Sequence, residues 1–474
     1  MRAHIYEVFC EHRLGQDLSG ILNFMPDRPP APPRHLLFGN LRELRHDALG
    51  FLVSAAKECG DIFSFRFMFF PGLLVNHPDY IRHVLQENHR AYSKRHFDYA
   101  ILRPVLGEGL LTSDGDFWLR QRRLIQPAFH RQRVAGFGAQ MVQDTQEMLR
   151  RWEPICRDGR ALDLDEEMMR LTLTIVGRAL FSVELNSQAG TIGPAFSFIN
   201  AEVAQLFRSL LPTPLKFRLP RFQRALGELN RTVQLIIDQR RAQLAQSGEA
   251  GDDLLAMLIQ ARDEQSNELM TDQQLRNEVL TLMLAGHETT ANALTWTWYL
   301  LSQHPQAAER LRRELASVLN GRPPQLDDLP ALPYTRMVVQ EALRLYPPAW
   351  IISRKAEQDD QIGEYAIPAG TVVSLSPYVM HRHPDFWPRP EAFDPERFRP
   401  EQADSRPAYA YFPFGGGPRL CIGRDFATQE ALLILATVAQ RYSLQLVPGH
   451  PVEPEPLITL RPKYGMKMTL TPQP

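Results

Sequence analysis

The sequence predicts a mainly α protein with smaller β-sheets, an α+β fold, and three observations support this. Helical periodicity dominates residues 134–246. A second helical stretch starts at Thr271 and meets no proline before Pro305. Short alternating apolar runs near both ends of the chain predict strands. The chain has 474 residues, of which 44% are hydrophobic, enough for a sizeable core; length alone would suggest two or three domains, although large single domains exist.

Composition argues against several classes of protein. The net charge of −1 gives no basis for nucleic-acid binding. The four cysteines are scattered and form no C-x-x-C pair, which argues against a disulfide framework or zinc cluster and favours a reducing compartment. Charged residues interrupt the N-terminus, so no apolar run approaches the ~20 residues that a transmembrane anchor needs. We therefore expect a soluble, cytoplasmic protein, and we expect a monomer.

The first regular elements follow the proline-rich residues 26–33, which are too poor in backbone donors for helix or sheet and should lie extended on the surface. Residues 63–67 alternate between apolar and polar side chains, and residues 73–75 form a short apolar run. With Pro71-Gly72 as the turn, this pattern predicts a β-hairpin. A helix should begin near Pro78.

Residues 86–115 have poor periodicity, which predicts a loop with short helical pieces. A helix that carries two hydrogen-bond donors on one face is expected after them. This helix contains Trp118 and Arg122, which are four residues apart and therefore share one face. Taken alone, the pattern fits an amphipathic surface helix. Further along, residues 196–211 are unusually apolar, and core packing is the simplest explanation.

The longest predicted helix begins with a capping box, Thr271 with Gln274. About 30 residues of helix would span about 45 Å. Residues 279–285 are apolar on nearly every face, so this helix should be buried at the centre of the molecule.

A carboxylate falls within that buried stretch. Burying Glu288 is costly unless it has partners or a water-filled niche. The neighbouring Thr289 could simply hydrogen-bond to a carbonyl four residues earlier, but this does not account for Glu288. The pair His287-Glu288 suggests a zinc protease, yet position 291 is alanine, so the motif H-E-x-x-H fails.

Two helices and two strands should follow. Residues 305–319 form a helix ended by Asn320-Gly321, and residues 333–346 form another that ends at Pro347-Pro348. Residues 350–354 and 371–375 read as strands, with a turn at residues 368–370, and the tail at residues 456–462 alternates like one further strand. His381 and His383 could bind a metal, but solvated loop histidines are the more common case.

The most distinctive stretch is F-x-x-G-x-R-x-C-x-G, from Phe414 to Gly423. Cys421 lies between a glycine-rich loop and an apolar helix, where free backbone amides should lower the thiol pKa and favour a thiolate that binds a soft metal. A buried, inert cysteine is the ordinary alternative. No G-x-G-x-x-G forms here, and no phosphate-binding P-loop motif occurs in the chain.

Five motifs in order resemble those of the cytochrome P450 monooxygenases: W-x-x-x-R, A-G-x-E-T, E-x-x-R, P-E-R-F and the cysteine stretch, which together span Trp118 to Gly423. The resemblance implies the P450 fold, with its long central helix over a haem b whose iron is bound by Cys421. It also implies a single domain over 1–474, with an N-terminal extension and proline-rich strap over 1–35. It implies that Ala285 and Gly286 open a groove beside the haem. It also implies that Glu288 and Thr289 relay protons to bound dioxygen.

The resemblance assigns further roles. It implies that Phe414 lies beside the sulfur and that a buried network of Glu341, Arg344 and Arg397 steadies the cysteine loop. Residues 196–211 would belong to mobile lid helices. The haem propionates would be bound by Trp118, Arg122, Arg354, Arg419 and, on the same edge, Lys94, and the substrate pocket would be lined by Leu111, Ala285, Ala349, Ile351 and Ile458.

The expected reaction is insertion of one oxygen atom into a C–H bond of a hydrophobic substrate such as a fatty acyl chain or a terpenoid. Leu73-Leu74 stands where related fatty-acid hydroxylases carry a cationic anchor, which disfavours a free carboxylate substrate. The chain ends too soon after Gly423 for a fused reductase, so a separate ferredoxin or flavodoxin with its reductase should supply electrons, docking near Arg120 and Arg123. The alternatives are a peroxide-using or isomerising haem enzyme, which the intact Glu288-Thr289 pair disfavours, and a non-catalytic haem sensor.

Overall fold

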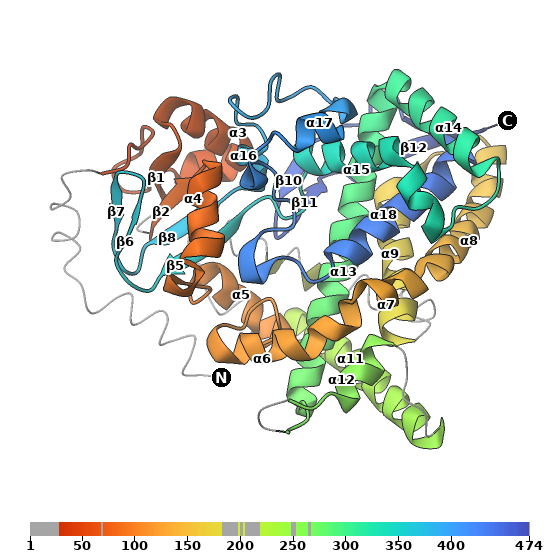
Figure 1. Cartoon of the computed structure of the whole chain (residues 1–474), viewed down its shortest axis with the longest axis horizontal. Coiled ribbons are helices and arrows are strands. Elements are labelled where there is room, and N and C mark those ends of the chain that lie inside the picture. Colours follow the sequence, from red (N-terminus) through yellow and green to blue (C-terminus); the bar gives the residue numbers. More distant parts are fainter. Residues whose placement is uncertain are drawn as a thin grey trace.

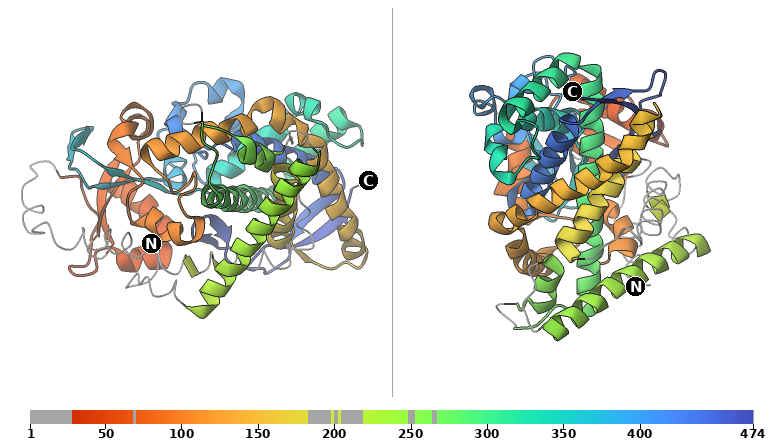
Figure 2. Two further views of the ribbon diagram at one scale, coloured as in Figure 1. Left: turned by 90° about the horizontal axis from the view of Figure 1, so that it is seen from below. Right: turned by 90° about the vertical axis from the view of Figure 1, so that its right-hand side faces the viewer.

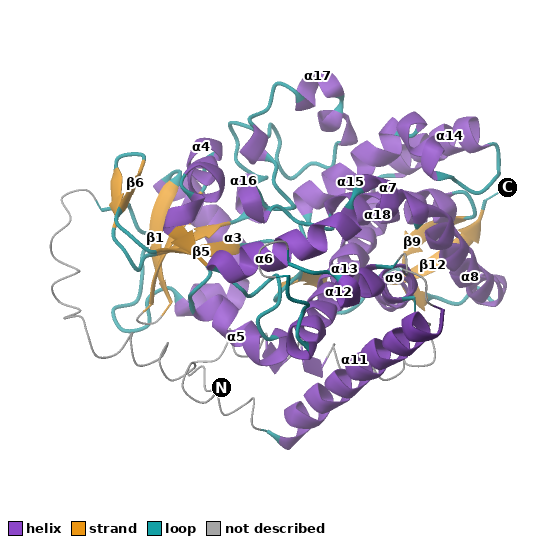
Figure 3. Cartoon of the chain, turned by 60° about the horizontal axis from the view of Figure 1, so that its bottom comes forward, coloured by secondary structure: helices purple, strands orange, loops and turns teal. Residues whose placement is uncertain are grey.

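A sheet-rich part and a helix-rich part lie side by side in the molecule (Figure 1). The computed structural model describes residues 28–67, 70–182, 198–199, 202–203, 219–247, 253–263 and 267–473. Most strands gather at one end, a smaller group lies at the other, and helices fill the space between them (Figure 3). This matches the predicted mainly α fold with smaller β-sheets.

The central helix α13 (Asp272–Gln303) has 32 residues and begins at the predicted capping box. Gln274 N donates to Thr271 Oγ1 at 3.2 Å, and Thr271 N donates to Gln274 Oε1 at 2.8 Å. Seen from below, α13 runs through the middle of the molecule with helices around it (Figure 2). It packs against α9 (Leu164–Phe181), α15 (Pro333–Leu345) and α18 (Arg424–Ala439). The apolar stretch at its centre is therefore buried, as its composition predicts.

Shorter helices cover this core. Helix α14 ends where predicted, because Asn320 and Gly321 adopt positive φ angles of 48° and 79° that a continuing helix does not allow. The other α-helices in the described residues are α3 (Leu41–Cys59), α4 (Pro78–Arg82), α5 (Phe97–Leu106), α6 (Gly115–Ile125), α7 (Arg131–Gly136), α8 (Gly138–Arg157), α11 (Pro220–Ser247), α12 (Leu254–Gln260), α14 (Pro305–Leu319), α16 (Pro377–Met380) and α17 (Pro400–Ala403). Turns of 3₁₀ or π type lie at His83–Glu87, His89–Ala91, Gln126–Phe129, Leu326–Ala331, Pro395–Phe398, Ala408–Ala410 and Gly417–Arg419.

The largest sheet has five strands in the order β1-β2-β8-β5-β3. The predicted hairpin is present, but Pro71-Gly72 is not its turn: both residues pair within β2, with Gly72 opposite Phe65. The missing Cβ of Gly72 explains its place there, because a Cβ would lie 2.6 Å from the Phe65 ring. The strands are β1 (Ile62–Phe67), β2 (Phe70–Val75), β3 (Tyr92–Ser93), β5 (Ile352–Ala356) and β8 (Val372–Leu375).

Three small sheets complete the fold. The predicted tail strand is instead a hairpin of β10 (Pro454–Pro456) and β11 (Leu460–Pro462), because residues 457–459 turn the chain back on itself. The connection between β5 and β8 contains a second unpredicted hairpin, β6 (Asp360–Ile362) with β7 (Tyr365–Ile367). The last sheet has the order β4-β12-β9, from β4 (Leu162–Asp163), β12 (Lys467–Pro472) and β9 (Tyr442–Leu446).

Four further predictions from the sequence can be compared with the described residues. The predicted loop over residues 86–115 contains a ten-residue helix, α5. Residues 28–34 of the proline-rich strap form neither helix nor strand, and Ser64 N donates to Pro30 O at 2.8 Å. Most of the expected lid region, 196–211, lies outside the described residues. Among the helices that the structure describes, none combines the length and the apolar character needed to cross a membrane.

Candidate active site

One large cavity brings together every residue that the sequence singled out for a site. Its volume is about 2550 Å³, and α13 and the loop that carries Cys421 both line it. Pockets for single drug-sized ligands are usually about 300–1,000 Å³, so this one can hold a large flat cofactor and a substrate together. The predicted residues on its wall are Lys94, Leu111, Trp118, Arg122, Ala285, Glu288, Thr289, Ala349, Ile351, Arg354, Phe414, Arg419, Cys421 and Ile458.

The cysteine loop owes its path to three glycines with different surroundings. A Cβ on Gly416 would lie 2.3 Å from the Tyr409 ring, and one on Gly417 would lie 1.8 Å from the Leu85 carbonyl oxygen. A Cβ on Gly415 would have no neighbour within 4 Å, and Gly415 borders the cavity. Two glycines therefore let the loop pack against the protein, and one leaves room for a group in the cavity.

Cys421 is exposed to this cavity and enclosed by protein on its other sides. Its backbone N donates to Phe414 O at 3.0 Å, which places Phe414 beside it. The expected lowering of the thiol pKa is wrong for this structure: burial raises the pKa of Cys421, against smaller opposite effects of the Gly423 amide and of Arg122. A bound metal deprotonates a coordinating thiol. Formation of the Cys421 thiolate therefore depends on a metal and not on the start of the helix.

A buried ionic network supports the loop from behind. Arg344 and Glu341, both fully buried, pair through two hydrogen bonds of 2.7 and 2.8 Å, and Arg397 Nε lies 3.4 Å from Glu341. Arg344 also donates to the carbonyls of His381 and Pro390 at 2.9 and 2.6 Å. Because each charge has several partners, the network is stable in the core and fixes the surrounding loops, as the sequence predicted.

His381 corrects the expectation of solvated loop histidines. It is fully buried, and Phe412 N donates to its Nε2 at 3.0 Å. Burial and the charge of Arg344 hold the pKa of His381 well below its usual range, so the ring is neutral and can accept this bond. His381 therefore links the ionic network to the start of the cysteine loop. His383 is also buried and lies 2.9 Å from Asp61.

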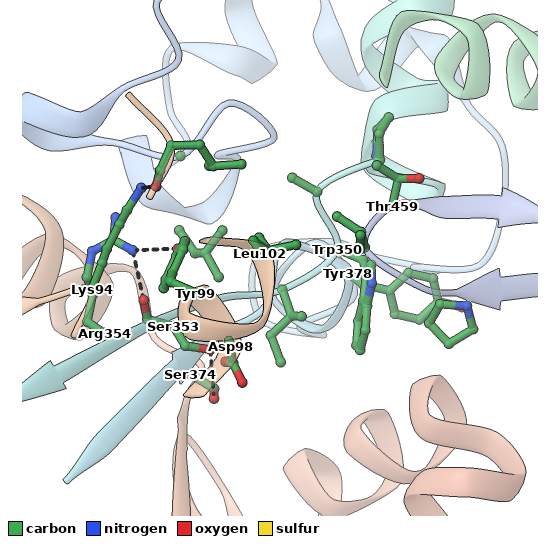
Figure 4. Close-up of a pocket in the computed structure, with 18 of the residues that line it drawn as sticks. Lys94, Asp98, Tyr99, Leu102, Trp350, Ser353, Arg354, Ser374, Tyr378 and Thr459 are labelled. Atoms are coloured by element: carbon green, nitrogen blue, oxygen red, sulfur yellow. Dashed lines mark hydrogen bonds between the residues drawn. The ribbon is translucent and has the colours of Figure 1, made fainter. Parts of the chain in front are cut away.

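Four cationic side chains line the cavity together. Lys94 and Arg354 are buried near Tyr99, and Arg354 donates to the Tyr99 hydroxyl at 3.3 Å (Figure 4). Arg419 pairs with Asp114 and lies over the Trp118 ring at 4.1 Å. The fourth cation, Arg122, donates to Leu420 O at 2.9 Å, one residue before the cysteine.

These cations have too few protein anions to balance them. Burial, together with Arg354 and Arg419, holds the pKa of Lys94 well below its usual range, and Asp114 opposes this only in part. A group with two carboxylates that occupied the cavity would relieve this repulsion. The residues present thus fit a porphyrin: a thiol for the iron, cations for the propionates and apolar walls for the ring.

Central helix α13 presents small and polar residues to the cavity. Ala285 is exposed to it, and Thr289 Oγ1 donates to Ala285 O at 2.6 Å. Gly286 lines the cavity beside Ala285, as the resemblance implied. Gly286 also allows α13 and α9 to pack closely, because a Cβ on it would point at Val176 of α9, 3.0 Å away.

Glu288 has the partner that its burial requires. Its side chain is 6% exposed, and Thr459 donates to its Oε1 at 2.8 Å. Asn292, one turn further along α13, donates to Thr459 Oγ1 at 3.1 Å. No local pattern predicts this contact, which joins residues 171 positions apart.

The rest of the cavity wall is mainly apolar. Trp350, between Ala349 and Ile351, donates from Nε1 to Leu457 O at 2.9 Å and so fixes the neighbouring wall that carries Ile458. The expected Leu73 lines the cavity, but so do charged residues that the sequence reasoning missed, including Arg45 and Arg66. A leucine at position 73 is therefore not sufficient to exclude a carboxylate substrate.

Two further outcomes concern charge near the cysteine. Arg120 and Arg123 lie 3.3 and 3.9 Å from the buried Asp263, which offsets the free positive charge that we expected for partner docking. Tyr99 and Asp114 hold the cation cluster in place but were not predicted. Each contacts an arginine that is far away in the sequence, and neither residue belongs to a local motif.

Comparisons with known proteins agree with this site. The family model described as Cytochrome P450 matches residues 29–469. Cyclooctatin synthase from Streptomyces melanosporofaciens is 38% identical over 436 residues, covering 91% of this chain and 93% of the relative. Cyclooctat-9-en-7-ol 5-monooxygenase from the same organism is 36% identical over 435 residues, covering 90% and 92%.

A solved structure supports the fold. The cytochrome P450DA heme domain superposes with a TM-score of 0.86 at 27% identity, over 94% of this chain and 98% of that one. Family, fold and site thus agree: haem is the cofactor, and dioxygen, an organic substrate and a redox partner belong to the reaction. The chain is a member of the cytochrome P450 family and a haem-dependent monooxygenase.

Proposed function

We propose that this monooxygenase inserts one oxygen atom into a C–H bond of a bulky hydrophobic substrate, either a terpenoid hydrocarbon or an alkenol. One observation carries the proposal: Cys421, the cation cluster and the pair Glu288 and Thr289 line the same cavity, whose remaining wall is mainly apolar. The relative named for cyclooctat-9-en-7-ol supports an alkenol as one candidate substrate.

The residues have distinct roles in this proposal. The Cys421 thiolate would bind the haem iron, and Phe414 would shield the sulfur. Trp118 and the cations Lys94, Arg122, Arg354 and Arg419 would bind the propionates through charge-assisted hydrogen bonds. When bound, haem supplies the activation of dioxygen.

Glu288 and Thr289 handle protons. Thr289 Oγ1 borders the cavity and holds its hydrogen toward the Ala285 carbonyl at 2.6 Å, so its lone pairs face away from the helix backbone. Glu288 keeps Oε1 engaged with Thr459, and its side chain also lines the cavity. In the proposed path, a proton passes from the Glu288 carboxyl to the Thr289 hydroxyl, which would deliver it into the cavity.

The ligand role of Cys421 is tested with Cys421→Ser. The variant should lose the ferrous–CO absorption band that is typical of thiolate-bound haem, because serine is a poor ligand for this iron. The matched control is Cys156→Ser, since Cys156 does not line the cavity and should leave the band unchanged. A band that survives Cys421→Ser would exclude Cys421 as the ligand.

The substrate class is tested with ligand-induced spin shifts of the haem. Cyclic terpenes and alkenols should shift the Soret band at lower concentrations than free fatty acids of equal carbon number. Fatty acids are the second candidate, because Arg45 and Arg66 line the same cavity. If fatty acids bind more tightly, and Arg45→Ala removes this preference, the terpenoid proposal fails.

The electron donor is proposed to be a separate ferredoxin or flavodoxin with its reductase. Product formation should then require the donor, and hydrogen peroxide alone should support little product. Equal rates with peroxide and no donor would favour the peroxide-using alternative. Product without net consumption of dioxygen would favour an isomerase.

A further inference from the structure

A hydroxyl group on the hairpin of β10 and β11 has a position that the proposed function leaves unused. Thr459 lies next to β11 and is 7% exposed. Its neighbours are fixed on both sides: Trp350 Nε1 donates to Leu457 O at 2.9 Å, and Trp296 Nε1 donates to Leu460 O at 3.1 Å. The tip of the hairpin is therefore held against α13. Figure 4 shows Thr459 and Trp350 among the residues that line the pocket.

The direction of the Thr459 hydrogen is determined by its two partners. A hydroxyl has one hydrogen and two acceptor lone pairs. The hydrogen goes to Glu288 Oε1 at 2.8 Å, and one lone pair accepts from Asn292 Nδ2 at 3.1 Å. The second lone pair is left to accept a proton. Asn292 Oδ1 is buried and has no hydrogen-bond partner in the described part of the chain. The bond to Thr459 therefore orients the Asn292 amide with its Nδ2 toward the hydroxyl.

A second acid interacts with this group. Asp165 is in the first turn of α9 and interacts electrostatically with Glu288 and Arg461. Its Oδ1 is buried and has no hydrogen-bond partner among the described residues. Arg461 is partly exposed to solvent and lies 3.1 Å from Glu455.

Asp165 can exchange protons near neutral pH. Burial and, to a smaller extent, the negative charge of Asp163 raise the pKa of its carboxyl to about 7, against an opposing effect of Arg461. A group with a pKa near the working pH is an effective proton donor. The charged groups that face Asp165 are Asp163 from β4, Glu166 from α9, Glu288 from α13 and Arg461 from β11.

We propose that Thr459 positions Glu288 and conducts protons to it, and that Asp165 is the acid through which these protons enter from solvent. Asp165 gives a proton to intervening water, which passes one to the free lone pair of Thr459 Oγ1, while Thr459 gives its own hydrogen to Glu288 Oε1. One proton moves in total, and no group is oxidised or reduced. This supply route rests on the proposed role of Glu288.

The first test needs no turnover. In the resting holoenzyme, Glu288→Gln identifies the infrared carboxyl band of Glu288 by its loss. Thr459→Val should shift this band, because the hydrogen bond is removed, and Thr459→Ser should restore its position. An unmoved band in Thr459→Val would overturn the positioning role, whether or not the enzyme has the proposed substrate.

The second test measures the fraction of electrons recovered in product. Thr459→Val should lower this fraction about 10-fold and raise the solvent isotope effect, and Thr459→Ser should recover most of it. The matched control is Thr437→Val in α18, a buried threonine bonded to Leu433 O at 2.7 Å and absent from the cavity wall. A shifted infrared band with unchanged coupling would overturn proton conduction.

The third test concerns Asp165. Coupling in the unchanged protein should fall as the pH rises through about 7, where Asp165 loses its proton. Asp165→Asn should remove this dependence and lower coupling at pH 6 about 10-fold. An unchanged pH profile would exclude Asp165 as the entry acid. Absence of any product from the unchanged protein would instead contradict the proposed function and leave the infrared test valid.

Discussion

At the scale of single residues, the site combines side chains whose neighbours decide their chemistry. Cys421 shows this most clearly, because burial raises its thiol pKa although it precedes a helix. Glu288 tolerates burial because Thr459 donates to it. In both cases a sequence motif predicted the residue, but residues elsewhere in the chain determine the surroundings of its side chain.

Thr289 should be required to couple electron consumption to product formation, and not for the stability of the fold. Thr289→Ala should retain haem and substrate binding but lower the fraction of electrons recovered in product at least about 10-fold, releasing peroxide instead, because the hydroxyl no longer passes protons. The measurement compares NADPH consumed with product and peroxide formed.

The control for this variant lies further along the same helix. Thr297 makes the same bond, from Oγ1 to Ala293 O at 2.6 Å, but is buried away from the cavity. Thr297→Ala should cost similar stability and leave coupling unchanged. Equal uncoupling in both variants would show that the effect comes from the helix and not from the cavity.

At the scale of helices and strands, adjacent residues predicted where elements end, whereas contacts between distant residues were not predictable. The capping box and prolines predicted the bounds of α13, α14 and α15, because helix ends depend on adjacent residues. The length of helix α5, the hairpin of β6 and β7 and the burial of His381 were not predicted. Each depends on tertiary packing, and the contact between Thr459 and Glu288 spans 171 residues.

The close packing of α13 on α9 should depend on Gly286. Gly286→Val should destabilise the protein by about 1–3 kcal/mol, because its Cβ would lie 3.0 Å from Val176 and its methyl groups would lie closer. Adding Val176→Ala should recover part of this loss, measured as the coupling free energy of a double-mutant cycle in urea.

Gly227 on α11 provides the comparison for this substitution. It lies within a helix, and a Cβ added to it would have no neighbour within 4 Å, so Gly227→Val should change stability by less than about 0.5 kcal/mol. A similar loss at both glycines would mean that helix propensity, and not helix packing, explains the effect at Gly286.

At the scale of the whole molecule, three acids around the central helix have carboxyl pKa values that burial raises. Glu278 lies on α13, Asp165 on α9 and Glu430 on α18. Burial raises the pKa of Glu278 to about 8 and of Asp165 to about 7, and it raises the pKa of Glu430 well above its usual range. The folded protein therefore retains protons that the unfolded chain loses.

This retention gives stability a definite dependence on pH. Between the ordinary pKa of glutamate, 4.5, and about 8, the folded state binds the Glu278 proton and the unfolded state releases it. The contribution of a raised acid pKa is therefore full below this window and is lost as the pH rises through it. One such group changes the free energy of unfolding by up to about 1.4 kcal/mol per pH unit.

Glu278→Gln should remove this dependence. The Glu278 carboxyl accepts a hydrogen bond from Leu110 N at 3.0 Å, and glutamine can accept the same bond without ionising. The variant should match the unchanged protein near pH 5 and become progressively more stable than it toward pH 8, measured as the difference in urea midpoint at each pH. Glu401→Gln, at an exposed site on α17, should produce no such trend. A constant difference at all pH values would mean that Glu278 is ionised in the folded protein, with its charge balanced by a partner.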